Sequence, residues 1–151
     1  MNRKKIRVGF LAPLSAPGWL DAGSLLLAGF QAGINKINSR GYSDGATIEP
    51  LIRDTAGNAD LASEMVRSLK REGVEALAGE YHSVVARSIS QVAHELKLPY
   101  LCSSAVLDKL IDTPSDWVAR LPPPQSIGWA RYAEYLCSLG HTQVATLYSD
   151  S

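Results

Sequence analysis

The chain has 151 residues, of which 46% are hydrophobic and 20% are charged, as is typical of one soluble globular domain. Fifteen basic and fifteen acidic residues give a net charge of zero, so the sequence lacks the positive charge with which proteins bind nucleic acid. It also lacks an apolar run of about 18 residues, and we therefore expect no transmembrane helix and no direct insertion into a membrane.

The first expected element is a buried strand over residues 6–11, whose sequence is IRVGFL. A basic segment at 3–5 followed by this apolar run imitates the beginning of a secretory signal peptide. However, Arg7 interrupts the run, and Pro13 and Pro17 follow it closely, so a strand explains the pattern better. The sequence leaves open whether an export signal has been removed from a precursor.

The rest of the chain alternates helical and extended patterns. Asn58 is expected to cap the helix that carries the apolar stripe of 61–69. Strands separated by helices of this length are typical of βαβ units, so the sequence predicts an α/β fold with an open, mainly parallel sheet and helices on both faces. The expected helices carry the apolar stripes of 27–37, 61–69 and 85–96 and the stretch 126–139, and the further strands lie at 46–54, 74–79, 98–104, 117–121 and 143–150.

Three consecutive prolines at 122–124 form the clearest break in this pattern. Proline has no backbone N–H, so it cannot donate a hydrogen bond to a neighbouring strand, and it disfavours a helix at the residue before it. A run of prolines forms a stiff, extended spacer. The segment is either a loop within one domain or a hinge between two lobes. In the second case, residues 1–121 form an N-terminal lobe, and residues 122–151 contain the crossover and the first helix and strand of a second lobe.

Polar residues follow most of the expected strands. Ligands bind outside the carboxyl ends of the strands in open parallel sheets, so these residues should lie along one rim. They are Ser15 after the first strand, Asp54 after the second, Ser83 after the third, and Ser103 and Ser104 after the fourth.

The stretch GEYHSVV at 79–85 is the richest in polar side chains. Ser83 precedes an expected helix, and we expect it to be the N-cap. The free N–H groups of a first helical turn attract anions, so a ligand carboxylate or carbonyl could bind there together with the Ser83 hydroxyl. A serine hydrolase that uses Ser83 and His82 is less favoured, because the Gly-x-Ser-x-Gly pattern is missing and adjacent side chains rarely meet. We therefore expect a binding protein and no enzyme.

Other residues near this rim have two interpretations each. Glu80 could be a general base by position, but a solvated or cleft-lining carboxylate fits it better. Tyr81 is either one wall of a pocket or a packed core residue. Trp19, in the loop after the first strand, either lines a binding cleft or anchors the loop. We count Tyr81, His82 and Trp19 among the ligand-binding candidates together with Ser83.

No cofactor or metal site is expected. Asp54 could meet a ribose in a dinucleotide-binding fold, but the sequence after the first strand lacks Gly-x-Gly-x-x-Gly, and the chain has no Gly-Lys-Ser/Thr phosphate loop. The two cysteines, Cys102 and Cys137, have no metal-ligand spacing, and we expect two buried thiols rather than a disulfide.

Several segments, taken in order, resemble type I periplasmic binding proteins, and most closely the leucine/isoleucine/valine-binding family of ABC-transporter receptors. The segments are IRVGFLAPLSAPG and AGFQAGINKINSRG near the start, RDTAGNADLASEMVRSLKREGVEALAGEYHSVVARSISQVAHELKLPYLCSSA in the middle, and WVARLPPPQSIGWARYAEYL near the end. Each motif is loose alone, but their order and spacing are fairly specific, and they cover nearly the whole chain.

The resemblance implies two α/β lobes that close over a small ligand, an amino acid or a similar polar solute. It implies that Ser83 binds the amino-acid backbone and that Ser104 and Val106 contact ligand, although the family commonly has Thr where this chain has Val106. It also implies a membrane permease as partner and a periplasmic or extracellular location, lipid-anchored or soluble. GEYHS is similar as well to amide-sensing regulators, which leaves open a sensor domain in the cytoplasm.

The family's chains are much longer than 151 residues. The resemblance therefore implies an incomplete protein, in which residues 1–121 are most of the first lobe and 122–151 begin the second. The strands and helices that return to the first lobe are missing from it. We expect weak or no ligand binding by this chain alone.

Overall fold

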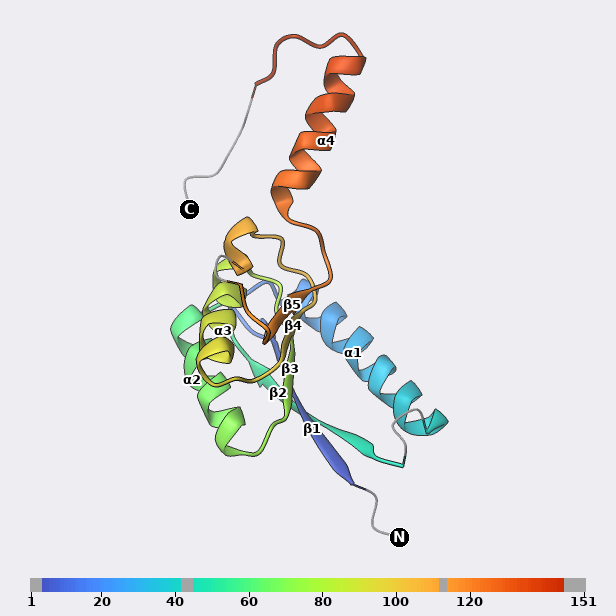
Figure 1. Cartoon of the computed structure of the whole chain (residues 1–151), viewed down its shortest axis with the longest axis vertical. Coiled ribbons are helices and arrows are strands. Elements are labelled where there is room, and N and C mark those ends of the chain that lie inside the picture. Colours follow the sequence, from blue (N-terminus) through green and yellow to red (C-terminus); the bar gives the residue numbers. More distant parts are fainter. Residues whose placement is uncertain (1–3, 42–44, 112–113, 146–151) are drawn as a thin grey trace.

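A computed structural model describes residues 4–41, 45–111 and 114–145 (Figure 1). Its centre is a sheet of five parallel strands in the order β2-β1-β3-β4-β5, which confirms the predicted α/β fold. The strands are β1 (Lys5–Ala12), β2 (Thr47–Asp54), β3 (Ala76–Gly79), β4 (Tyr100–Cys102) and β5 (Val118–Arg120). The helices are α1 (Leu20–Arg40), α2 (Ala59–Arg71), α3 (Ser83–Glu95) and α4 (Gln125–Ser138), with a short 3-10 helix, η1 (Asp108–Ile111).

The main core lies between the sheet and the helices α2 and α3, which cover one of its faces (Figure 1). The buried residues of α2 are Ala62, Val66 and Leu69, which recur every three or four positions. Leu61 and Met65, which belong to the expected stripe, flank them and are half-buried. α3 buries six residues on the same side, so both helices are fixed by apolar packing.

α1 lies on the opposite face over β1 and β2, so helices cover both faces as predicted (Figure 1). The rings of Phe10 on β1 and Phe30 on α1 stack with centroids 4.4 Å apart. This cover does not extend to β4. Side chains alternate along a strand, so Leu101 points away from the core that buries Tyr100 and Cys102, and it is 40% exposed.

α4 extends away from the sheet and buries none of its residues (Figure 1). Among the described residues, the hydrogen bonds that join it to the body of the fold come from its first turn. The Gln125 N–H donates to the Val106 carbonyl oxygen at 2.9 Å, and the Ser126 N–H donates to Asp108 Oδ1 at 3.0 Å. The helix follows directly on the prolines, with Pro124 as its N-cap residue.

The C-terminal region tests two expectations. Cys137 lies on α4 and is exposed because this helix has no buried residue, so the prediction of two buried thiols holds for Cys102 alone. The expected strand at 143–150 does not form over residues 143–145, and its remaining residues lie outside the described part of the chain.

Candidate binding site at the carboxyl end of the sheet

The strand order brings the loops after β1 and β3 together at the carboxyl end of the sheet. β1 pairs with β2 on one side and with β3 on the other. In a sheet of order 2-1-3-4-5 the strand order reverses between β1 and β3, and ligands bind at this switch point. The loop after β1 carries Trp19, and the loop after β3 carries Tyr81, His82 and the start of α3 at Ser83. Four of the sequence candidates therefore meet where the topology favours a ligand.

Trp19, Tyr81 and His82 contact one another across these two loops. The rings of Trp19 and Tyr81 meet edge-on with centroids 5.2 Å apart, and those of Tyr81 and His82 with centroids 5.8 Å apart. The Trp19 backbone N–H donates to His82 Nε2 at 3.1 Å. Trp19 is 55% exposed and Tyr81 is half-buried, so the two rings form an aromatic wall that solvent can reach.

α3 begins at Ser83 with an open N-terminus. Its N-cap is His82, which makes no capping hydrogen bond through its side chain, so the expectation that Ser83 caps the helix is wrong. The Ala86 N–H donates to the His82 carbonyl oxygen, whereas the N–H groups of Ser83, Val84 and Val85 have no acceptor within the described part of the chain. The first turn carries no acidic residue. The free N–H groups and the helix dipole therefore present partial positive charge beside the Ser83 hydroxyl.

Glu80 is fully buried, which corrects the expectation of a solvated or cleft-lining carboxylate. Its Oε1 accepts hydrogen bonds from the N–H groups of Tyr81 and His82, both at 2.9 Å, and its Oε2 accepts one from the Thr55 hydroxyl at 2.9 Å. Burial raises the pKa of Glu80, and these hydrogen bonds oppose that effect only in part. Thr55 precedes Glu80 by 25 positions, so no local pattern could reveal this pair.

The loop after β4 lies beside the end of β3, because the Ser103 N–H donates to the Gly79 carbonyl oxygen at 3.1 Å. The Ser103 hydroxyl is buried and has no hydrogen-bond partner among the described residues. Ser104 is half-buried. The loop is also held from β5, since Arg120 donates to the Leu107 carbonyl oxygen at 2.7 Å.

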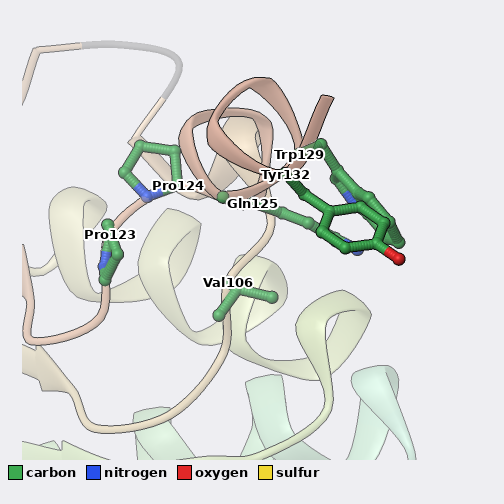
Figure 2. Close-up of a pocket in the computed structure, with 7 residues that line it drawn as sticks. Val106, Pro123, Pro124, Gln125, Trp129 and Tyr132 are labelled. Atoms are coloured by element: carbon green, nitrogen blue, oxygen red, sulfur yellow. The ribbon is translucent and has the colours of Figure 1, made fainter. Parts of the chain in front are cut away.

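Val106, in the same loop, lines a different hollow of about 360 Å³ beside α4 (Figure 2). Trp129 and Tyr132 lie next to each other on its α4 side, with ring centroids 6.3 Å apart. Neither residue was predicted to belong to a site, although a spacing of three on a helix predicts contact between the two rings. The other lining residues are Pro123, Pro124, Gln125 and Gly128. Since neither Trp19 nor Tyr81 lines this hollow, the structure does not join Val106 to the aromatic wall.

Asp54 orders the loop after β1. Its Oδ1 accepts the N–H groups of Leu14 at 2.7 Å and Ala56 at 2.9 Å. Burial acts to raise the pKa of Asp54, but hydrogen bonds from the Ser15 hydroxyl and from backbone N–H groups outweigh it and hold the pKa below its usual value. The Asp54 carboxylate is thus occupied by hydrogen bonds from the loops after β1 and β2.

The arrangement does not form a serine–histidine pair. His82 Nε2 already accepts the Trp19 N–H, so it is not directed at the Ser83 hydroxyl. No hydrogen bond joins the Ser83 hydroxyl to His82 or Glu80 in the described part of the chain. Within residues 4–41, 45–111 and 114–145, no group of three or more His, Cys, Asp or Glu could hold a metal ion. No helix in these ranges is long and apolar enough to cross a membrane.

Known proteins resemble the chain in sequence and in fold. A family model described as periplasmic binding protein matches residues 5–151. The comparison with curated proteins gave no match. An ABC transporter substrate-binding protein from Desulfitobacterium hafniense, solved in complex with Leu, has a TM-score of 0.84 and 19% identity, and the match covers 98% of this chain and 43% of that one.

Two further solved structures are similar. LivJ from Streptococcus pneumoniae, a branched-chain amino acid transporter substrate-binding protein in complex with isoleucine, has a TM-score of 0.76 and 24% identity over 82% of this chain and 35% of that one. An ABC transporter solute-binding protein from R. palustris, in complex with 4-hydroxybenzoate, has a TM-score of 0.75 and 22% identity over 91% of this chain and 37% of that one.

The chain thus spans 35% to 43% of the length of these three proteins. Their likeness shows the fold, and it agrees with the parallel sheet and its two helical layers. The family model extends over nearly the whole sequence, from the first strand onwards. On this ground the chain belongs to the periplasmic binding protein family.

Proposed function

We propose that the chain is part of the solute-binding component of an ABC import system and that it holds a small solute at the carboxyl ends of β1 and β3 without any chemical step. The observation that carries this proposal is the open N-terminus of α3 beside the aromatic wall of Trp19 and Tyr81. Membership of the periplasmic binding protein family supports a solute as the ligand.

The ligand that fits this surface best carries a carboxylate and an apolar body. Three unpaired N–H groups and the helix dipole favour a negative charge at the start of α3, and the Ser83 hydroxyl adds a donor. The rings of Trp19 and Tyr81 offer apolar contact to the rest of the ligand. Leucine, isoleucine and 4-hydroxybenzoate, which the similar structures contain, all have this composition.

The rest of the proposed role follows from the family. A second lobe closes over the solute by a hinge motion, and a membrane permease receives it. Residues 1–121 belong to the first lobe, and residues 122–151 begin the second; the absence of buried residues on α4 supports this division. The site of action is periplasmic or extracellular. Ser104 contacts the solute from the loop beside β3, and Val106 contacts it only on closure.

The test is an NMR titration of the chain with leucine, isoleucine and 4-hydroxybenzoate. A single lobe should bind weakly, with a Kd of about 1 mM, and the resonances of the Ser83–Val85 N–H groups and of the Trp19 ring should move. Leucinamide, which keeps the apolar body but has no carboxylate, serves as the control ligand. Equal shifts with leucine and leucinamide, or no shifts with any of the three probes, would contradict the proposal.

A matched pair of variants sharpens this test. Ser83→Ala removes one donor to a charged group and should weaken binding about tenfold. Ser24→Ala changes an exposed serine on α1 and should leave the affinity as it is. The same affinity for both variants would exclude Ser83 from the site.

A further inference from the structure

Glu80 lies where three loops meet, below the surface that we assign to the ligand. Its N–H donates to the Leu11 carbonyl oxygen at the end of β1 at 2.8 Å, and its carboxylate accepts the Thr55 hydroxyl from the loop after β2. Its backbone φ is 68°, a left-handed conformation that is unfavourable for a residue with a β-carbon. A buried carboxylate and a strained backbone both lower stability. The hydrogen bonds of Glu80 offset these costs, and their partners are the groups that Glu80 holds in place.

Those hydrogen bonds lead from Glu80 to Trp19 by way of His82. Oε1 of Glu80 accepts the His82 N–H and fixes the backbone at the start of α3. The His82 ring then accepts the Trp19 N–H at Nε2. Gly57 lies beside the same edge of this ring, since a β-carbon on Gly57 would lie 3.4 Å from Nε2. The position of the Trp19 backbone therefore depends on a buried group that does not touch it.

We propose that Glu80 is a positioning residue, which acts through His82 to hold Trp19 against Tyr81. This inference rests on the proposed function, because the two rings need a fixed position only as a surface for a ligand. Loss of the Glu80 carboxylate leaves the N–H groups of Tyr81 and His82 without their acceptor. The His82 ring then moves, and the Trp19 N–H loses its acceptor as well.

The arrangement carries its own pH signature, because only an unprotonated Nε2 accepts an N–H. Acidification that protonates His82 breaks the bond to Trp19. Among the described residues, the ionisable groups that interact with His82 are Glu80 and Tyr81, both on its own loop. The loop after β1, residues 13–19, contains no ionisable side chain.

The experiment follows the Trp19 backbone N–H and the His82 ring nitrogens by NMR from about pH 5 to about pH 8, the range in which histidine titrates. In the wild-type chain the Trp19 resonance should move in one step together with the His82 ring. In Glu80→Ala the Trp19 step should disappear while His82 still titrates. Glu80→Gln retains an oxygen for both N–H groups and an amide for Thr55, so the step should return. Glutamine does not ionise, which assigns the step to His82.

Controls keep the result specific to Glu80. Glu64→Ala changes an exposed glutamate of α2 and should leave the Trp19 step unchanged. Glu80→Leu fills the same space without an acceptor, and it takes the place of Glu80→Ala if the alanine variant does not fold. The proposal would be overturned if the Trp19 N–H resonance of Glu80→Ala or Glu80→Leu moved with pH as much as in the wild type. It would also be overturned if this resonance did not move with pH in the wild-type chain.

Ligand titration separates this proposal from the proposed function. If the wild-type chain binds leucine or 4-hydroxybenzoate, Glu80→Ala should weaken that binding about tenfold, and Glu80→Gln should restore it. Equal affinity in Glu80→Ala and the wild type would refute a positioning role for ligand binding. Failure of the wild-type chain to bind either probe would overturn the proposed function, whereas the Trp19 step would still decide whether Glu80 acts through His82.

Discussion

α3 and α4 are helices of nearly equal length, 13 and 14 residues, but they are fixed in different ways. α3 buries six residues between the sheet and α2, whereas α4 buries none and is tied to the fold by the hydrogen bonds of its first turn. Apolar packing therefore fixes the helix that presents the free N–H groups of the site. The position of α4 depends instead on the loop after β4.

A matched pair of isoleucine truncations tests whether α3 is packed more firmly than α4. Ile89 is fully buried on α3, and Ile127 is 52% exposed on α4. Ile89→Ala should lower the free energy of unfolding by about 2–5 kcal/mol, because it leaves a cavity in the core. Ile127→Ala should change it by less than about 0.5 kcal/mol. Urea unfolding measures both, and similar losses would show that α4 is packed as firmly as α3.

Two glycines of helix α1 test how closely this helix packs on the rest of the fold. A β-carbon on Gly23 would lie 1.9 Å from the Pro13 carbonyl oxygen, so Gly23→Ala should destabilise the fold by about 1–3 kcal/mol. A β-carbon on Gly29 would meet nothing within 4 Å, and Gly29→Ala should stabilise the helix by about 1 kcal/mol. Thermal unfolding of both variants should show shifts of opposite sign. The same sign for both would contradict the close contact of α1 with Pro13.

The carboxylate beneath the start of α3 predicts a dependence on pH. Burial raises the pKa of Glu80 above its ordinary value of 4.5, so the folded state favours the protonated form. The stability that Glu80 contributes is present below that ordinary value and is lost as the pH rises through the raised pKa. Relative to the wild type, Glu80→Gln should therefore be more stable at pH 7 than at pH 4, as denaturation at the two pH values measures.

Asp54 provides a comparison of opposite sign. Its hydrogen bonds outweigh burial and hold its pKa below the ordinary value of 3.8. Its contribution to stability is therefore present above that value and lost as the pH falls through the lower pKa. Asp54→Asn should be destabilising at pH 7 and less so at acid pH. If the stabilities of Asp54→Asn and Glu80→Gln, each relative to the wild type, changed in the same direction with pH, the direction of the pKa shift given for Asp54 or for Glu80 would be refuted.

The smallest effect concerns the cysteines. Cys102 is buried in β4, and Cys137 is exposed on α4. A thiol reagent should therefore modify Cys137 in the native protein at about the rate of a free thiol, and Cys102 only after unfolding. Mass spectrometry of the partly modified chain identifies the residue. Early modification of Cys102 would mean that the core opens more readily than α3 packing implies.

Local patterns in the sequence were sufficient to predict the elements of the sheet and the helices around it. Apolar residues at helical spacing predicted α2, and the Asn58 side chain accepts the Leu61 N–H at 3.0 Å as the predicted cap. Strand ends were less predictable. The expected strand at 98–104 is shortened to Tyr100–Cys102, because the Leu98 N–H donates to the end of α3 and the Ser103 N–H donates to Gly79.

The candidate site was predicted only in part. Topology and turn chemistry brought Trp19 and Tyr81 to one place, because loops at the same end of parallel strands are neighbours. The burial of Glu80 could not be predicted, since it depends on the distant hydroxyl of Thr55. The same carboxylate accepts the N–H of His82, which is the N-cap of α3 in place of Ser83. The exposure of Cys137 depends on α4, a helix that buries none of its residues.

The attachment of α4 has a mechanical consequence. A helix of 14 residues is about 21 Å long, so a rotation of about 10° at its first turn moves its last turn by about 4 Å. The hydrogen bonds from Gln125 and Ser126 transmit such a rotation to Val106 and Asp108 in the loop after β4. A rotation of α4 would therefore displace the loop after β4, which also contains Ser104, by much less than it displaces the last turn of the helix.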